Sequence, residues 1–206
     1  MATLLQIKTS LFSDQGQSSR LAARFVERWR AANPGGHVIT RDLALDPVPH
    51  LTAERFQAFL AQPGARTAGQ QAHVAASDAL VAELEAADTI VLALPMYNFG
   101  VPSTLKAYFD HVGRAGRTFR YTEKGAVGLL QGKKAIVVAT RGGLYAGTPL
   151  DTQTTYVRDF LRFIGIEDVE FVYAEGLAMG DEPKARALAV AHEAIAALPV
   201  PLRAAA

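Results

Sequence analysis

Hydroxyl, amide and glycine residues gather near the start of the chain, just before a region with helical periodicity. The candidate binding residues are Ser10, Gly16, Gln17 and Ser18. The unpaired amides and the dipole of a helix N-terminus attract an anion such as a phosphate. No lysine follows the glycine, as it would in a nucleoside-triphosphate loop, and the sequence contains no G-x-G-x-x-G dinucleotide motif. The alternative is that Ser18 or Ser19 simply caps the helix.

A second cluster combines aromatic, amide and glycine residues directly after an apolar run at 89–94. Its candidate binding residues are Met96, Tyr97, Asn98 and Phe99, and Gly100 follows them. An unbroken apolar run is typical of a strand that helices cover on both faces, so the cluster would follow a buried strand. The two aromatic rings could pack against a flat ligand ring, and the amide could hydrogen-bond its polar edge. Alternatively, the segment is a turn that lines the core, with Pro102 beginning the next helix.

A third cluster follows another apolar run, at 133–140. It consists of Thr140, Arg141, Gly142 and Gly143. Two adjacent glycines allow the backbone to approach a ligand closely. A phosphate site beside a site for a flat ring suits flavin mononucleotide (FMN). Arg141 would then stabilise a reduced, anionic flavin, or it would pair with a surface carboxylate instead.

Apolar runs with strand character alternate with segments of helical period along the whole chain. Strands are expected at 3–8, 37–41, 89–94, 133–140 and 169–174, and helices at about 18–32, 52–60, 67–86, 103–112, 152–164 and 182–198. This alternation predicts an α/β fold with a doubly wound five-stranded parallel sheet and helices on both faces. Ligands bind such sheets outside the carboxyl ends of the strands, where the three clusters would meet.

One segment does not fit this alternation. Two short extended stretches, 118–122 and 127–130, flank Glu123-Lys124-Gly125 and predict a hairpin excursion near 117–130. The sequence shows no repeat or linker, so residues 1–206 are expected to form a single domain.

Composition excludes several classes of protein. The 206 residues carry a formal net charge of +1, without the basic stripe of a nucleic-acid-binding protein. The absence of cysteine excludes a disulfide framework, a cysteine nucleophile and thiolate metal sites. No apolar run approaches the roughly 18–20 residues of a membrane span, and we find no secretory signal. We therefore expect a cytoplasmic protein without a metal, a nucleic-acid partner or a membrane segment.

Taken together, these motifs resemble the bacterial FMN-dependent NADH-azoreductases, which are also NADH:quinone oxidoreductases with a flavodoxin-like fold. The resemblance rests on Met96-Tyr97-Asn98-Phe99, Tyr108-Phe109-Asp110, Thr118 to Thr122 and Thr140-Arg141-Gly142-Gly143, and it extends to 25–30 and 164–166. The chain has Thr140 where the family commonly has serine, and Gly16 lies in a loop that is often richer in serine. Thr140 keeps the hydroxyl, and Gly16 can still offer its backbone amide.

The resemblance implies tightly bound FMN. Its phosphate would lie among Ser10, Gly16, Gln17 and Ser18, and its ring among Met96, Tyr97, Asn98, Phe99, Thr140, Arg141, Gly142 and Gly143. The resemblance also implies a homodimer with active sites at the interface. Phe119 and Tyr121 of the hairpin would then reach the partner's flavin, and Phe163 would line the same pocket. The sequence alone does not distinguish these three aromatics from core residues.

The reaction that the resemblance implies is ping-pong transfer of hydride. NADH or NADPH would reduce the flavin and leave, and a small aromatic azo compound or quinone would then take the hydride. We assign no catalytic acid or base, because none of the histidines lies in the three clusters. His111 and Asp110 are better explained as structural residues, and we expect protons to come from solvent.

Three other functions are compatible with such a fold. A flavodoxin-type electron carrier is usually shorter and acidic, which this chain is not. A nucleotide sensor would bind flavin without turnover, since fold alone does not fix function. A flavin reductase would release reduced FMN during turnover.

Overall fold

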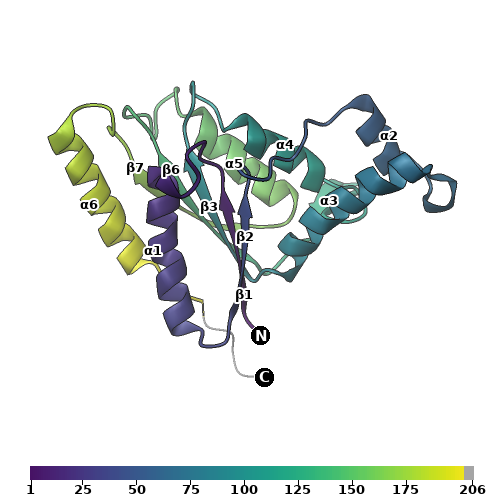
Figure 1. Ribbon diagram of the computed structural model, residues 1–206, viewed down its shortest axis with the longest axis horizontal. Helices are drawn as coiled ribbons and strands as arrows, with labels where there is room; N and C mark the ends of the chain where they lie inside the picture. Colours follow the sequence, from purple (N-terminus) through teal and green to yellow (C-terminus); the bar gives the residue numbers. More distant parts are fainter. Residues whose placement is uncertain (202–206) are drawn as a thin grey trace.

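A five-stranded sheet forms the centre of the molecule (Figure 1). The computed structural model describes residues 1–201. All neighbouring strands are parallel, and in spatial order they are β2 (His37–Asp42), β1 (Thr3–Lys8), β3 (Thr89–Pro95), β6 (Lys134–Thr140) and β7 (Asp168–Ala174). The predicted doubly wound α/β fold is confirmed.

Helices cover both faces of the sheet (Figure 1). One face carries α1 (Gln17–Ala32) and α6 (Asp181–Ala197), and the other carries α3 (Ala68–Ala86), α4 (Ser103–Val112) and α5 (Thr152–Phe163). The short helix α2 (Ala53–Leu60) packs on α3, away from the sheet. Two 3₁₀ turns, Ser13–Gln15 and Pro63–Ala65, precede α1 and α3. None of the described helices is both long and apolar enough to span a lipid bilayer.

The spacing of apolar residues explains this packing. In α1, Leu21, Phe25 and Trp29 recur every four residues, so they form one stripe, and each is at most 1% exposed. In β3, alternate residues point to opposite faces, so Val91 packs towards α1 and Leu92 towards the other helices. Every residue of β3 is buried, as its unbroken apolar run predicted.

The order of the strands places a topological switch point beside β1. The chain leaves β1 towards α1 on one face, whereas it leaves β3 towards α4 on the other. Doubly wound sheets bind ligands at the carboxyl edge where connections diverge in this way, and we call the region between the loops at this edge the crevice. Three loops surround it: the β1–α1 loop (residues 9–16), the β3–α4 loop (96–102) and the β6–α5 loop (141–151). Together with Gln17 and Ser18 of α1 and Thr140 of β6, they carry the three clusters that the sequence singled out.

The excursion is an antiparallel hairpin of β4 (Phe119–Thr122) and β5 (Gly125–Gly128). The predicted second strand, 127–130, was two residues too late, because Thr122 pairs with Gly125 across a two-residue turn. Glycines at both ends of β5 weaken the sequence signal of a strand. Gly128 has a packing role, since a Cβ atom there would lie 2.1 Å from the backbone nitrogen of Gly165.

Candidate functional site

The β1–α1 loop folds tightly over Ser10, whose side chain is buried. The Ser10 hydroxyl accepts a hydrogen bond from the Phe12 amide (3.2 Å) and lies 3.4 Å from the Tyr97 hydroxyl. The Tyr97 hydroxyl in turn accepts a hydrogen bond from the Leu11 amide (3.2 Å). Gly16 closes the loop at a point where a Cβ atom would lie 2.2 Å from the Ser10 Oγ atom. The β1–α1 and β3–α4 loops are therefore joined at the crevice.

The buried Lys8 at the end of β1 binds the β1–α1 loop through Asp14. The Nζ atom of Lys8 lies 2.7 Å from Asp14 and 2.9 Å from Asp42, and Ser13 donates a hydrogen bond to Asp42. Burial alone would lower the pKa of Lys8, but the hydrogen bonds and charges of the two aspartates outweigh it and raise that pKa. Lys8 is thus committed to these carboxylates, in keeping with a phosphate site built from hydroxyls and amides.

The N-terminus of α1 faces the same loop. The N-cap residue is Gly16, and no side chain caps the helix, so the alternative that a serine caps it is wrong. Ser18 and Ser19 are buried, and their hydroxyls have no hydrogen-bond partner among residues 1–201. The first amides of a helix also lack intrahelical partners. Gln17, Ser18 and Ser19 thus offer an anion two kinds of donor at one place.

The β3–α4 loop contains a strained turn. Tyr97 and Gly100 exchange backbone hydrogen bonds of 3.2 and 3.0 Å, and the two residues between them have positive φ angles, 50° for Asn98 and 64° for Phe99. Left-handed backbone of this kind costs roughly 1–3 kcal/mol per residue and persists only where the surroundings hold it. Asn98 and Phe99 are exposed towards the solvent rather than lining the core. The turn therefore presents both side chains above the carboxyl edge.

The β6–α5 loop is pinned by a buried cation. The Arg141 side chain is fully buried and lies 2.7 Å from Asp151 and 3.1 Å from Glu175, with its guanidinium 5.0 Å from the Tyr173 ring. Of the two roles expected for Arg141, the structure shows the pairing with carboxylates, although the partners are largely buried rather than on the surface. Two carboxylates offset its single charge through its terminal nitrogens, whereas its buried Nε atom has no hydrogen-bond partner among the described residues.

The backbone of the same loop has donors without partners. The carbonyl groups of Arg141, Gly142 and Gly143 accept hydrogen bonds from Leu177, Ala178 and Gly176 (2.9–3.1 Å). The amides of Gly142 and Gly143 donate to no group among the described residues. Thr140, at the end of β6, accepts from the Met96 amide (2.9 Å) and so joins this loop to the β3–α4 loop. Two free amides beside the crevice can recognise the polar edge of a ring.

Glu175 and Asp151 have roles that sequence analysis missed. Besides Arg141, the Glu175 carboxylate accepts the amides of Tyr145 and Ala146, both at 2.9 Å. Burial would raise the pKa of Asp151, but hydrogen bonds from Arg141 and Thr154 outweigh it and hold that pKa below its usual range. Asp151 is also the N-cap of α5, where it accepts hydrogen bonds from the amide and hydroxyl of Thr154. That local signal could have marked Asp151 as a cap, but not as a partner of Arg141, and Glu175 is distant in sequence from Arg141, Tyr145 and Ala146.

The Asp151 interaction predicts a dependence of stability on pH. A carboxyl with a lowered pKa stabilises the fold above its unfolded pKa, about 3.9, and this contribution is lost as the pH falls through the folded pKa. We expect Asp151→Asn to be less stable than the wild type at neutral pH, and the gap between the two to narrow below about pH 4. Urea unfolding between neutral and acidic pH measures this gap. A gap that stays constant would contradict the assignment.

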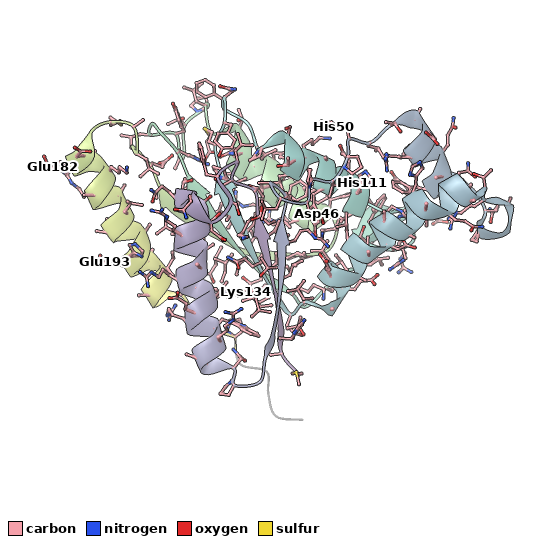
Figure 2. All side chains as sticks on the ribbon, viewed as in Figure 1. Asp46, His50, His111, Lys134, Glu182 and Glu193 are labelled. Atoms are coloured by element: carbon pink, nitrogen blue, oxygen red, sulfur yellow. The ribbon has the colours of Figure 1, made fainter. Side chains whose placement is uncertain are left out.

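His111 lies outside the crevice. It is 1% exposed, its ring packs edge-on against Phe59 at 5.8 Å, and it lines a hollow together with Asp46 and Pro49 of the segment that follows β2 (Figure 2). Burial, together with the charge of Arg55, lowers its pKa and favours the neutral ring. A position between helices and away from all three loops suits a structural residue.

The three predicted substrate aromatics come together away from the crevice. Phe119 lies 5.4 Å from the Tyr121 ring and 4.3 Å from the Phe163 ring, measured between centroids. Phe119 is buried, whereas Tyr121 is 76% and Phe163 37% exposed. They line a hollow of about 370 Å³ together with Phe56 and Leu60 of α2. The aromatic hollow, as we call it, opens on the face formed by α2, α5 and the hairpin.

A further hollow, of about 770 Å³, lies at the opposite edge of the sheet. Its lining includes Asp88, Lys134 and Asp168, at the amino ends of β3, β6 and β7 (Lys134 in Figure 2). Doubly wound sheets bind ligands at the carboxyl edge, and no residue of the three loops reaches this hollow. The crevice is therefore the candidate site.

Comparison with known proteins identifies the family. The profile of a family described by its flavodoxin-like fold matches residues 2–198. An FMN-dependent NADH:quinone oxidoreductase of Cellvibrio japonicus is 59% identical over 189 residues, which cover 92% of this chain and 95% of that protein. The chain belongs to the flavodoxin-like family of FMN-dependent NADH:quinone oxidoreductases. The family that the sequence motifs suggested is thus confirmed.

Other members of this quinone oxidoreductase family show the same full-length similarity. An FMN-dependent NADH:quinone oxidoreductase of Alcanivorax borkumensis is 55% identical over 194 residues, covering 94% of this chain and 98% of that protein. A crystal structure similar to this chain is that of an FMN-dependent NADH-azoreductase from Bacillus anthracis in complex with FMN, whose sequence is 28% identical to this one. Its TM-score is 0.84, and the match covers 95% of this chain and 98% of that one.

The crevice has groups that fit each end of FMN. At the α1 end, the buried Ser18 and Ser19 hydroxyls have no partner within the described chain, and a phosphate would supply one. At the other end, the free amides of Gly142 and Gly143 suit the carbonyl oxygens of the flavin pyrimidine. The exposed turn at Asn98 and Phe99 lies between these ends in the order of the strands. The residues present therefore fit the cofactor of this oxidoreductase family.

Proposed function

We propose that this chain uses tightly bound FMN to transfer hydride from NADH or NADPH to quinones and azo compounds. The main support is the crevice, where an anion-binding helix N-terminus meets an aromatic turn and a glycine loop in a member of this family. When bound, FMN supplies the redox chemistry, because its ring accepts two electrons with a proton from a nicotinamide and returns them to a second substrate.

The chain's own residues would bind and orient the cofactor. Ser10, Gly16, Gln17 and Ser18 would hold the phosphate through hydroxyls and amides. Met96, Tyr97, Asn98 and Phe99 would flank the ring on one side, and Thr140, Gly142 and Gly143 would bind its polar edge. For Arg141 we propose an indirect part, in which the buried guanidinium fixes the path of the two glycines.

We further propose a ping-pong order, with the nicotinamide and the acceptor occupying the same place in turn. The sequence has no dinucleotide motif that would hold NADH at a separate site. Protons would come from solvent, since the charged groups beside the crevice are already paired. Lys8 is bound to two aspartates and Arg141 to two carboxylates.

A homodimer with shared active sites explains the aromatic hollow. Phe163 ends α5, whereas Thr152 at its start contacts the β3–α4 loop through Phe99. At 1.5 Å per residue, these ends are roughly 16 Å apart, which is too far for Phe163 to touch a ring held by its own chain. A partner chain could bring its crevice to this face. Phe119, Tyr121 and Phe163 would then line the acceptor site of the partner.

Anaerobic spectroscopy of the purified full-length protein tests the function. We expect a yellow protein that bleaches with NADH and regains its colour when a quinone or an azo dye is added. An electron carrier or a sensor would not be bleached by NADH, and a flavin reductase would lose FMN on gel filtration during turnover. A protein that stays colourless and inert when FMN is supplied would refute the proposal. Analytical ultracentrifugation tests the dimer.

A further inference from the structure

The first turn of α5 contacts both loops that flank the ring end of the crevice. Asp151 and Thr154 bind Arg141 of the β6–α5 loop at 2.7 and 3.0 Å. Thr152 donates a hydrogen bond to the Phe99 carbonyl of the β3–α4 loop. Between them lies Gln153, which is completely buried and belongs to neither predicted cluster. One helical turn thus fixes two segments that come from different strands.

Gln153 binds both ends of the turn formed by Met96 to Phe99. Its Nε2 atom donates to the Pro95 carbonyl at 3.0 Å and to the Gly100 carbonyl at 2.9 Å. These carbonyls stand immediately before and after Met96 to Phe99. A single side-chain amide therefore fixes the two ends of that segment, and both of its N–H groups are used.

The segment needs such a support because its backbone is strained. Asn98 and Phe99 both occupy the left-handed region, which non-glycine residues adopt only where surrounding contacts impose it. The contacts that impose it here come from Gln153 and Thr152 below and from the Tyr97–Gly100 pairing within the turn. Tyr145 adds an edge-on ring contact to Phe99, at 5.5 Å between centroids.

We propose that Gln153 is a positioning residue for FMN, which holds the 96–99 turn in the conformation that receives the ring. It does not touch the cofactor itself, because it is buried beneath the loop. This inference rests on the proposed function, since it concerns the same site. Loss of the Gln153 amide removes its hydrogen bonds to the Pro95 and Gly100 carbonyls and leaves Gly100 paired only with the Tyr97 amide. The strained turn can then relax, so the ring should be held less firmly.

Release of FMN from the full-length holoprotein measures this role. Free FMN fluoresces more strongly than FMN packed against aromatic rings, so dilution gives a dissociation constant. We expect Gln153→Met, which keeps the volume but removes the donor, to raise that constant about tenfold, the effect of one to two lost hydrogen bonds. The matched control is Val157→Ala, a change in the buried core of the same helix. It should reduce stability and leave the dissociation constant within about twofold.

A second variant separates positioning from general damage to the fold. Gln153→Glu has the same shape, but its carboxyl can donate only while protonated, and the two carbonyls disfavour its charged form. The FMN affinity of this variant, relative to that of the wild type at the same pH, should therefore fall as the pH rises. Equal FMN affinity in the wild type and both Gln153 variants at every pH would overturn the inference alone. A wild type that binds no FMN would instead refute the proposed function.

Discussion

Replacing Gly16 with alanine is expected to weaken FMN binding by at least about a hundredfold, which corresponds to roughly 2.7 kcal/mol. The added Cβ atom would lie 2.2 Å from Oγ and 2.5 Å from Cβ of Ser10. The second distance matters more, because the Cβ atom of Ser10 cannot rotate away as a hydroxyl can. Either the β1–α1 loop or the start of α1 must move, and both are proposed to bind the phosphate. Equilibrium dilution of the holoprotein measures the loss.

Two controls separate this effect from a general loss of stability. Gly64→Ala adds the same methyl group where no heavy atom lies within 4 Å, so it should retain FMN. In the second control, Ser10→Gly is combined with Gly16→Ala, which removes the side chain that clashes. The double variant should bind FMN more tightly than Gly16→Ala alone. Wild-type affinity in Gly16→Ala would show that the close packing of Gly16 and Ser10 does not shape the phosphate site.

Most of the fold could be predicted because the apolar patterns are strong and local. The β3 run is almost entirely apolar because helices cover both faces of the strand. In α1, apolar residues recur every four positions, so the spacing in the sequence matches the helix that forms. The hairpin was placed less accurately. Its second strand begins and ends with glycine, and Gly128 is present for its contact with Gly165, a neighbour that only the folded chain supplies.

The candidate site could be predicted only where its residues form local motifs. The three clusters follow strands β1, β3 and β6, so the topology that the sequence implied was enough to bring them together. Asp151, Gln153 and Glu175 support those clusters through contacts between elements that are distant along the chain. The position of Asp151 before α5 indicates a helix cap, but nothing in the local sequence indicates the contacts that these three residues make with the clusters. Arg141 belonged to a motif, yet its role depended on carboxylates 10 and 34 residues away.

The same carboxylates lead to the second large effect, the loss of stability expected for Arg141→Met. This change leaves Asp151 and Glu175 buried without their shared cation. Removing one partner of a buried ion pair typically costs about 3–5 kcal/mol, because the remaining charge is neither solvated nor paired. We expect a loss of that size in the free energy of urea unfolding at neutral pH. FMN affinity should fall too, since the amides of Gly142 and Gly143 lose their fixed path.

Comparison with other variants tests whether the unpaired charges cause this loss. Adding Asp151→Asn and Glu175→Gln to Arg141→Met removes both orphaned charges and should recover a large part of the stability. Arg186→Met is the matched control, because Arg186 pairs with Glu182 at 2.8 Å in a fully solvated position, with side chains 70% and 86% exposed. An exposed pair of this kind contributes at most about 0.5 kcal/mol. If Arg141→Met lowers the free energy of unfolding no more than Arg186→Met does, the buried charges do not hold the β6–α5 loop. If the triple variant recovers stability without recovering FMN binding, the guanidinium itself sets the path of the glycine amides.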